Sequence, residues 1–430
     1  MKLLLIFTLC IFFQSGFSED LQEEKGIILD PLLRSLLKKN NIHLLLTPPN
    51  RSNRSQFELG KKLFSDPILS GNKRISCQTC HNPEKGTSDG LPMSRTENGK
   101  GILRRNAQSL FNIGLNNKPF MFLDGRVHFN FTTKKFTTPD ESLNGNTPKA
   151  DYITSAMNSA LAAQALFPLV TDTEMMGKKG ENEIADSKDN LEAWERIVDR
   201  LKNNETFRDL LVQAYPHISI DQINIGHVVE AISIFEREEF QSIGSPFHRY
   251  LKGNDSAMSS QQKRGLLVFL GRGRCVSCHR GNELGNNSLF ASSSAPQWGK
   301  VPFVDDKGRG EIIHNPATNY FFKVPSLINI GLTAPYMHNG AFQTLNEVID
   351  HYNHISSSLN RFEVSEQRQS KIPVEVKVEK NQNFLDEIWL SSQGANNPQL
   401  KNRLYLTKCE KDDLKVFLQE ALTDPKWVKK

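Results

Sequence analysis

The fold is decided by two short stretches, Cys77-Gln78-Thr79-Cys80-His81 and Cys275-Val276-Ser277-Cys278-His279. Each follows the pattern C-x-x-C-H, which attaches haem c covalently to a protein. On a helical turn, residues three positions apart share a face, so both thiols can reach the vinyl groups of one haem. The neighbouring histidine then presents its imidazole to the iron. The sequence therefore predicts two covalently bound haem c groups, with His81 and His279 as the proximal iron ligands.

Other uses of these four cysteines fit less well. A structural zinc site could be built from two C-x-x-C pairs, but these pairs are far apart in the chain and the two histidines would have no role. Redox-active dithiols are a second alternative, although neither pair lies in a βαβ pattern. Of the other two cysteines, Cys10 lies in an apolar run near the start of the chain, and Cys409 is expected to be a free thiol.

The composition limits the class of protein further. The chain has 430 residues, with 53 Lys and Arg against 48 Asp and Glu, and 38% of its residues are hydrophobic. This length is enough for two domains of ordinary size with well-developed cores. A formal net charge of +5 is too small to suggest a nucleic-acid-binding surface. The sequence predicts no nucleic-acid partner, and the mature chain shows no segment apolar enough to span a membrane.

Residues 1–18 have the pattern of a secretory signal peptide. Lys2 provides the positive charge, and an apolar run from Leu3 to Phe13 follows. Gly16 and Ser18 then place small residues at positions −3 and −1 of a cleavage site. This pattern predicts export, to the periplasm if the source is a bacterium.

Helical periodicity dominates the rest of the chain. We expect a mainly α protein made of two cytochrome c-like domains, each with one covalently bound haem c, and with long loop insertions. The expected boundaries are a polar lead-in at 19–54, a first haem domain at 55–240 and a second at 241–430. Helices are predicted near 55–64, 155–167, 225–235, 266–270, 345–352 and 414–422, with one short strand at 374–378.

Several segments resemble the bacterial dihaem cytochrome c peroxidases and their MauG-type relatives. Leu59 to Pro67 leads into the first motif as in that family, and three further segments continue the likeness: Asp124-Gly125-Arg126, Val324 to Leu327 and Thr333 to Gly340. The resemblance covers about 56–425, with two interruptions. It implies a peroxidatic haem in the first domain, where hydrogen peroxide reacts. The second domain would be an electron-transfer domain that accepts electrons from a small cytochrome c or a cupredoxin.

The resemblance also implies catalytic residues over the first haem. Gln164 and Glu174 match a distal glutamine and glutamate of the family, and Pro168 matches the distal proline of MauG-type proteins. A carboxylate there accepts a proton from one peroxide oxygen and returns it to the departing one. Gln164 would donate a hydrogen bond that polarises the O–O bond.

The sixth coordination position of the first haem is expected to be open. Many of these peroxidases carry a loop histidine that coordinates this iron, but no histidine lies between His81 and Arg105. Met93 is the alternative ligand in that loop, although a methionine there is more often a packing residue.

The sixth ligand of the second haem is expected to be Tyr352. The family places a Met or Tyr nineteen residues after the threonine of its Thr-Ala-Pro segment, and Tyr352 stands at that distance from Thr333. His351 and His354 are competing candidates on the same helix. A phenolate ligand stabilises oxidised iron, so Tyr352 favours a MauG-like haem of low potential.

Three more features follow from the resemblance. A calcium ion lies between the domains in this family, and Asn106 with the carbonyl groups of Thr333 and Pro335 matches its protein ligands. Leu123 stands where the family usually has a tryptophan between the haems, so this chain lacks the residue of a tryptophan relay. Arg126 and His338 also match family positions, but the sequence assigns them no individual role.

Two insertions, near 127–163 and 356–400, are polar and are expected to be surface loops.

The favoured function is an exported peroxidase that reduces hydrogen peroxide with electrons from a small redox protein. The alternative is a MauG-like oxidase that uses peroxide to oxidise a partner protein. A pure electron-transfer cytochrome is a third hypothesis, but a carrier has no need of the distal pair Gln164 and Glu174. The sequence leaves a homodimer open.

Overall fold

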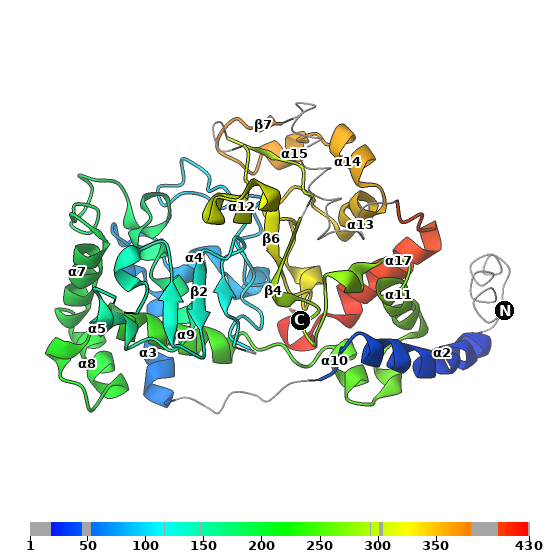
Figure 1. The fold of residues 1–430 in the computed structure, drawn as a ribbon, viewed down its shortest axis with the longest axis horizontal. Helices are drawn as coiled ribbons and strands as arrows, with labels where there is room; N and C mark the ends of the chain where they lie inside the picture. The colour runs from blue at the N-terminus through cyan, green and yellow to red at the C-terminus, as the bar shows by residue number, and fades with distance from the viewer. Residues whose placement is uncertain are drawn as a thin grey trace.

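The computed structural model describes residues 19–44, 53–115, 117–146, 148–292, 294–300, 304–379 and 403–428. The signal peptide predicted at 1–18 and the end of the second insertion lie outside these residues. The described chain is mainly helical, as predicted (Figure 1). The helices predicted near 55–64, 225–235, 266–270 and 345–352 are all present.

The helices are α2 (Glu19–Lys39), α3 (Arg54–Ser65), α4 (Cys77–Cys80), α5 (Asp151–Thr154), α6 (Ala160–Ala165), α7 (Asn190–Lys202), α8 (Glu205–Ala214), α9 (Ile225–Glu239), α10 (Pro246–Leu251), α11 (Ser260–Leu270), α12 (Arg309–Ile313), α13 (Leu345–Asn353), α14 (Ile355–Arg361), α15 (Glu366–Gln369) and α17 (Lys408–Val416). The strands are short and antiparallel: β1 (Phe120–Met121), β2 (Val127–Asn130) and β3 (Lys135–Thr137) form one sheet, β4 (Asn286–Ser292) pairs with β6 (Phe321–Val324), and β5 (Trp298–Gly299) pairs with β7 (Lys377–Val378).

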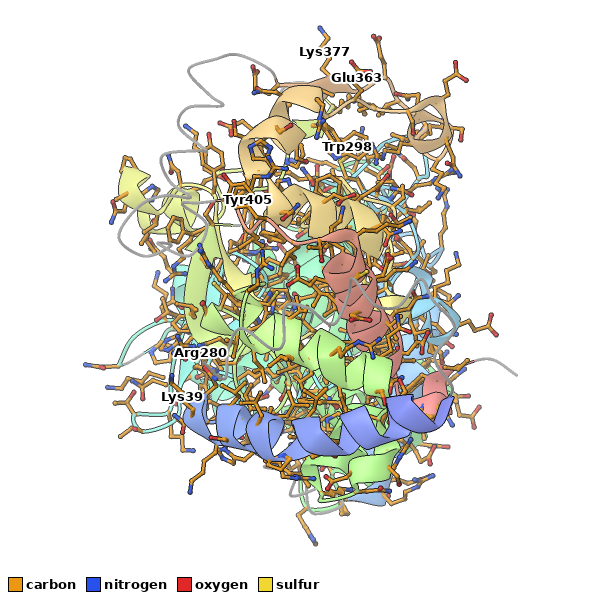
Figure 2. The ribbon with its side chains drawn as sticks, turned by 90° about the vertical axis from the view of Figure 1, so that its right-hand side faces the viewer. Lys39, Arg280, Trp298, Glu363, Lys377 and Tyr405 are labelled. Atoms are coloured by element: carbon orange, nitrogen blue, oxygen red, sulfur yellow. The ribbon has the colours of Figure 1, made fainter. Side chains whose placement is uncertain are left out.

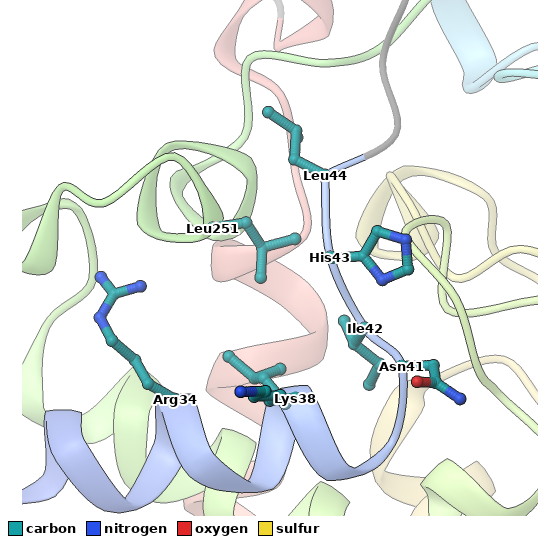
Figure 3. Close-up of a pocket in the computed structure, with 8 residues that line it drawn as sticks. Arg34, Lys38, Asn41, Ile42, His43, Leu44 and Leu251 are labelled. Carbon is teal, nitrogen blue, oxygen red and sulfur yellow. The ribbon is translucent and has the colours of Figure 1, made fainter.

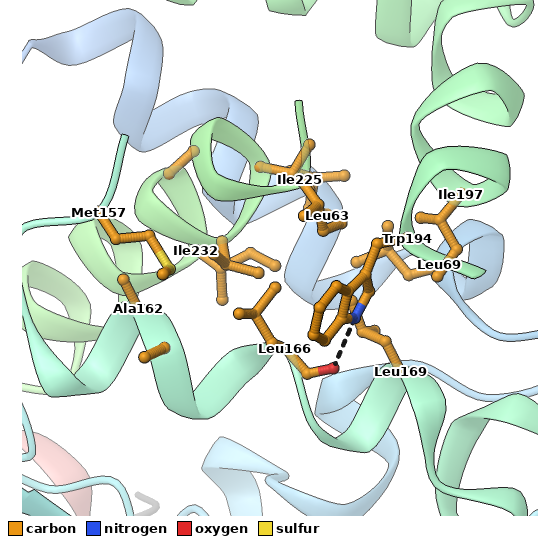
Figure 4. Packing of buried hydrophobic residues seen from close by; sticks show 14 of the residues in the cluster. Leu63, Leu69, Met157, Ala162, Leu166, Leu169, Trp194, Ile197, Ile225 and Ile232 are labelled. Atoms are coloured by element: carbon orange, nitrogen blue, oxygen red, sulfur yellow. Dashed lines mark hydrogen bonds between the residues drawn. The ribbon is translucent and has the colours of Figure 1, made fainter. Parts of the chain in front are cut away.

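The first hydrophobic cluster is built from residues between Phe57 and Phe240 and contains the faces of α3, α6, α7, α8 and α9. Figure 4 shows its centre, where the indole of Trp194 donates a hydrogen bond of 3.3 Å to the carbonyl oxygen of Leu166. Gly60 allows α3 to lie directly against α9, because a Cβ added there would be 2.0 Å from the Ala231 carbonyl oxygen. These contacts hold the helix that precedes the first haem motif.

The second hydrophobic cluster contains α11, α13 and α17 together with part of α2. Gly265 repeats the role of Gly60, since a Cβ added to it would lie 2.1 Å from the Asp413 carbonyl oxygen of α17. The helix predicted at 414–422 begins earlier, as α17, and continues as a π-helical turn over Phe417–Ala421. In both halves of the molecule, a helix that leads into a haem motif therefore crosses a later helix at a glycine.

The predicted lead-in contributes to the second half of the molecule. It forms α2, which lies beside α10 and α11 (Figure 1). Leu33 and Leu37 of this helix belong to the second hydrophobic cluster. The buried carboxylate of Asp30 accepts hydrogen bonds from Lys263 Nζ and the Tyr250 hydroxyl, each 2.8 Å long. Because a buried charge is costly unless it is paired, these two bonds tie α2 to its place.

The expectation of surface loops is wrong for much of the first insertion. β2 and β3 lie within 127–163, and Val127, Phe129 and Phe136 are buried in the first hydrophobic cluster. The helix predicted at 155–167 is interrupted, because α6 begins only after Ser159, whose side chain caps it. The backbone N–H of Asn158 instead donates to the carboxylate of Glu230, 3.0 Å away.

The described part of the second insertion, up to residue 379, is also more ordered than a surface loop. It contains α14 and α15; Leu359 is buried, and Phe362 and Ile372 belong to the second hydrophobic cluster. The predicted strand at 374–378 is reduced to β7, which pairs with β5 at Trp298 and Gly299. Figure 2 labels Lys377 and Trp298 from these two strands. Residues 380–400 of this insertion lie outside the described residues.

Candidate functional site

The first motif forms one helical turn, α4, as its spacing predicts. The Thr79 hydroxyl accepts a hydrogen bond of 3.0 Å from the backbone N–H of Ser76 and so caps the start of the turn. The backbone N–H of His81 donates to the Cys77 carbonyl oxygen at 2.9 Å, which continues the helical pattern to the histidine. Cys77 and Cys80 lie three residues apart within this turn and are both partly buried.

His81 is oriented by a carbonyl group of its own half of the molecule. Its Nδ1 lies 3.2 Å from the carbonyl oxygen of Thr87. The Thr87 hydroxyl is in turn 2.9 Å from Ser109 Oγ and accepts a hydrogen bond of 2.8 Å from the backbone N–H of Leu110. Burial lowers the pKa of His81 and keeps the ring neutral. When Nδ1 donates to a carbonyl, Nε2 keeps its lone pair for a metal.

The second motif begins with the 3-10 turn Cys275–Ser277, directly after α11. Arg274 enters this turn with a positive φ of 53°. His279 Nδ1 lies 2.9 Å from the carbonyl oxygen of Leu284, so its Nε2 is also left available. Burial lowers the pKa of His279, as it does that of the first histidine.

The chemistry of both motifs fits haem c. All five cysteines within the described residues are free of disulfide bonds. Burial raises the pKa of Cys77, Cys80 and Cys275 to about 12, so their sulfur atoms remain protonated thiols. Each motif thus presents two thiols and one neutral imidazole with a free Nε2, which is the donor set that a covalently attached haem requires. The predicted pairing of each motif with one haem therefore agrees with the local geometry.

Gln164 and Glu174 come from two elements that are separated by the 3-10 turn Pro168–Val170. Gln164 is at the end of α6, and its buried Oε1 has no hydrogen-bond partner among the described residues. Glu174 lies in a single π-helical turn, Asp172–Met176, a local geometry that is common at functional sites. Burial raises the pKa of the Glu174 carboxyl, and its negative charge in turn raises the pKa of Cys80. The structure therefore brings Glu174 close to the first haem motif.

Arg126 is the positive charge that acts on this carboxylate. Its positive charge acts against the effect of burial, so the pKa of Glu174 is raised less than it would be without Arg126. The guanidinium is held by Asp124, which accepts a hydrogen bond of 2.8 Å, and lies 3.6 Å above the ring of Phe122. Phe122 has a positive φ of 60°, which is rare for a bulky residue and frequent at functional sites. Its ring also contacts Phe167, next to the predicted distal proline.

Tyr352 lies on α13 with its hydroxyl close to the second motif. Burial, together with the neighbouring Cys278 and Cys275, raises the pKa of this phenol. The competing His351 is completely buried beside Phe342, with ring centroids 5.0 Å apart, and burial lowers its pKa to about 3. His354 is exposed at the end of the helix. Of the three candidates, Tyr352 is the one whose ionisation is affected by both thiols of the second motif.

Two of the three predicted calcium ligands meet in the structure. The Asn106 side-chain amide donates to the carbonyl oxygens of Pro335 and Leu91, at 3.1 and 3.0 Å. A calcium ion would need the amide oxygen in this position, which a rotation of the carboxamide provides. Met93, the alternative first-haem ligand, is buried in the second hydrophobic cluster.

A buried charge network between the two halves has no counterpart among the sequence predictions. Arg105 donates two hydrogen bonds to Asp306, at 2.7 and 2.9 Å, and a third to Asp124 at 2.5 Å. His338 Nε2 lies 4.0 Å from Asp306, and its ring stacks on Phe322 with centroids 4.2 Å apart. Asp306 is far from every motif in sequence, so its pairing with Arg105 becomes visible only in the fold. Through Asp124, this network reaches Arg126.

A surface pocket of about 340 Å³ lies between the end of α2 and Leu251 of α10 (Figure 3). Arg34, Lys38 and His43 contribute to its lining. None of the predicted site residues lines it. The pocket is therefore separate from the two haem motifs.

Comparisons with known proteins define the family. The family model for di-haem cytochrome c peroxidase matches residues 54–256. The cytochrome c551 peroxidase of Pseudomonas aeruginosa is 31% identical over 298 residues, which cover 68% of this chain and 70% of that protein. The methylamine utilization protein MauG of Methylorubrum extorquens is 30% identical over 296 residues, which cover 68% of this chain and 67% of that protein. The chain belongs to the di-haem cytochrome c peroxidase and MauG family, and is an oxidoreductase of that family.

Solved structures show the same fold. A MauG-like protein associated with microbial copper homeostasis has a TM-score of 0.59 and 24% identity, and the match covers 90% of this chain and 94% of that one. The diheme peroxidase BthA from Burkholderia thailandensis has a TM-score of 0.60 and 18% identity, and covers 89% and 90% of the two chains. The family implies two haem c groups and a peroxide substrate. Within the described residues, every helix is too short or too polar to cross a membrane.

Proposed function

We propose that this protein is an exported, periplasmic peroxidase that reduces hydrogen peroxide to water at the first haem site. Electrons would enter at the second haem site from a small cytochrome c or a cupredoxin. The observation that carries this proposal is Glu174, a partly buried carboxyl group of raised pKa that acts electrostatically on the first motif and is itself influenced by Arg126. A protein that only carries electrons has no use for such a group.

The proposed reaction takes up two electrons and two protons for each peroxide and releases two molecules of water. When bound at His81, the haem supplies an iron atom that can accept peroxide oxygen and deliver electrons to it. The Glu174 carboxylate takes the proton from one peroxide oxygen and gives it to the other, which then leaves as water. A raised pKa suits this exchange, because a carboxylate that must hold a proton briefly should not be a very weak base.

Gln164 would orient and polarise the O–O bond. Its buried Oε1 lacks a partner within the described chain, so the carboxamide is available for a ligand in this position. An amide can donate through Nε2 while Oε1 accepts, which suits the two ends of a peroxide molecule. Arg126, which Asp124 and Phe122 hold in place, would keep Glu174 ionised between turnovers.

A second candidate function is a MauG-like oxidase, and Tyr352 favours it. A phenolate ligand lowers the haem potential and stabilises the oxidised state. Such a haem could hold oxidising equivalents from peroxide and pass them to a partner protein. The replacement of the inter-haem tryptophan by Leu123 weakens this alternative.

The remaining parts of the proposal concern organisation. We propose cytochrome c-like domains at 55–240 and 241–430, which the two separate hydrophobic clusters support. The signal peptide at 1–18 and a homodimer stay predictions. A calcium ion bound by Asn106, Thr333 and Pro335 is supported by the contact between Asn106 and the Pro335 carbonyl group.

The test is peroxide turnover by the purified holoprotein with reduced cytochrome c as the electron donor. Glu174→Gln should lower kcat by about 10²- to 10⁴-fold, because the variant lacks the proton-transfer group. Asp172→Asn is the matched control, since Asp172 is an exposed acid in the same π-helical turn and should leave turnover unchanged. Rapid turnover that survives Glu174→Gln would refute the proposed mechanism. Slow donor turnover with a persistent oxidised state in the wild type would favour the oxidase instead.

A further inference from the structure

Three charged side chains are buried together where the two halves of the molecule meet. We call this group the seam cluster: Lys118 from the first half, and Glu283 and Lys323 from the second. Their exposed fractions are only 6%, 5% and 4%. Lys118 Nζ lies 2.7 Å from Glu283 Oε2 and donates a second hydrogen bond of 2.6 Å to the carbonyl oxygen of Asn112. Lys323 Nζ donates to the Phe120 carbonyl oxygen at 3.1 Å.

The seam cluster adjoins the loop that orients His279. Leu284, the residue after Glu283, provides the carbonyl oxygen that accepts the hydrogen bond from His279 Nδ1. The backbone of Glu283 is held firmly as well, because its carbonyl oxygen accepts hydrogen bonds from Ser326 Oγ at 2.9 Å and from the Leu327 N–H at 3.2 Å. The position of the Leu284 carbonyl is therefore fixed by a residue whose side chain is bound across the seam.

Buried ion pairs are a poor way to gain stability. Removing both charges from water costs several kcal/mol, and well-packed apolar residues often serve as well or better. The first motif shows that a charge pair is not needed to orient a proximal histidine, since the Thr87 and Ser109 hydroxyls support His81. A charge pair in this position is therefore better explained by an effect on the haem than by folding.

We propose that Lys118 and Glu283 are positioning residues that set the reduction potential of the second haem. This inference rests on the proposed binding of a haem at His279. A positive charge near a haem stabilises the reduced iron, and a negative charge stabilises the oxidised iron. Because the pair is buried, water screens these charges weakly, and the loss of either member exposes the haem to the charge of the other.

Lys323 strengthens this argument. Burial, together with repulsion from Lys118, lowers the pKa of Lys323 to about 7, while Glu283 acts in the opposite direction. Asp124 also acts on Lys323 in that direction, but Glu283 is the negative charge that acts on Lys323 and is also hydrogen-bonded to Lys118. Replacing it leaves an excess of positive charge beside the second haem, and replacing Lys118 removes part of that charge.

The experiment is a spectroelectrochemical titration of both haems in the full holoprotein. Glu283→Gln should raise the midpoint potential of the second haem, and Lys118→Met should lower it. The first haem should shift less in both variants, and the double variant should fall between the two single ones. Asp30→Asn is the control, because it removes a buried carboxylate that is paired with Lys263, twelve residues before Cys275, rather than with the Leu284 loop.

Shifts in opposite directions would support the proposal, because simple loosening of the loop would move both single variants in the same direction. Shifts in the same direction, equal shifts of both haems, or no shift would overturn it. If Lys118→Met does not fold, the midpoint potentials of the second haem in Glu283→Gln and Asp30→Asn are compared instead. A rise confined to Glu283→Gln supports the proposal, and its absence contradicts it. The titration needs bound haem but no turnover, so a failure of the peroxidase proposal would be recognised separately.

Discussion

At the first motif, His81 donates to a carbonyl group that neutral hydroxyls support, and all of these residues belong to one half of the molecule. At the second motif, His279 donates to a carbonyl group next to Glu283, which is bound to Lys118 of the other half. The carbonyl group that orients the histidine is thus supported by neutral hydroxyls at the first motif and adjoins a buried ion pair at the second. The motif fixes how a haem is attached, while its surroundings decide what that haem can do.

The ionisable groups near the two motifs also differ. Near the first motif is a carboxyl group, Glu174, with an arginine that opposes the effect of burial on its pKa. Near the second is a phenol, Tyr352, whose pKa is raised by burial and by the two thiols. A carboxyl group suits proton transfer, whereas a phenol close to iron suits coordination. This difference agrees with the proposal of proton chemistry at the first site and of a coordinating phenol at the second.

The largest expected effect concerns the charges that lie between the two sites. Arg105→Leu leaves Asp306 and Asp124 buried without their main partner, which should cost about 3–5 kcal/mol of unfolding free energy. Although burial raises the pKa of each carboxyl, the pairing with Arg105 leaves both lowered. Their stabilisation is therefore present above pH of about 4 and is lost as the pH falls below it. Chemical denaturation at pH 7 and at pH 3 measures this difference.

The control for this variant is Arg104→Leu, since Arg104 is more exposed and lies 3.8 Å from Asp306. Its effect should be smaller at both pH values. Equal losses of stability in the two variants would show that the network does not depend on Arg105.

Tyr352→Phe should change the second site and leave the first unchanged. The loss of an anionic ligand should raise the potential of the second haem and alter its absorption spectrum. His354→Gln, at the exposed end of the same helix, should leave both unchanged. A second-haem spectrum that is identical in Tyr352→Phe and the wild type would show that Tyr352 does not coordinate the iron.

Arg126→Leu should sharpen the assignment of the first site. Glu174 must be ionised to accept a proton, so kcat/KM for peroxide falls as the pH drops through its pKa. Because Arg126 lowers that pKa, its removal should move the acid limb of the profile to higher pH, by about one unit or less. Arg309→Leu is the control, because Arg309 binds the nearby Gly125 carbonyl but does not affect Glu174. An acid limb that stays at the same pH would show that Arg126 does not influence the ionisation of Glu174.

The smallest effect is expected at the neutral support of His81. Thr87→Val removes a hydroxyl that contacts Ser109 and the Leu110 N–H, which should cost about 1–2 kcal/mol of stability. Since no charge is lost, the potential of the first haem should change little. A shift as large as that produced by Glu283→Gln would contradict the distinction between the two histidine supports.

The sequence predicted much of what depends on local pattern. Both motifs, the helices α3, α9, α11 and α13, and the closeness of Glu174 to the first motif follow from spacing and from the family resemblance. The burial of β2 and β3 in the core did not follow, because the polar residues around Phe129 and Phe136 hide a short alternating pattern. The pairing of Lys118 with Glu283 joins residues 165 positions apart, so no local pattern could reveal it.

The division of labour between the two sites is tested most directly by the single-turnover rate constant for hydrogen peroxide in Glu174→Gln and Tyr352→Phe holoproteins. We predict that Glu174→Gln lowers this rate constant by about 10²-fold or more, while Tyr352→Phe keeps it within a few-fold of the wild-type value. A large loss in Tyr352→Phe, or full retention in Glu174→Gln, would contradict the assignment of peroxide chemistry to the first site.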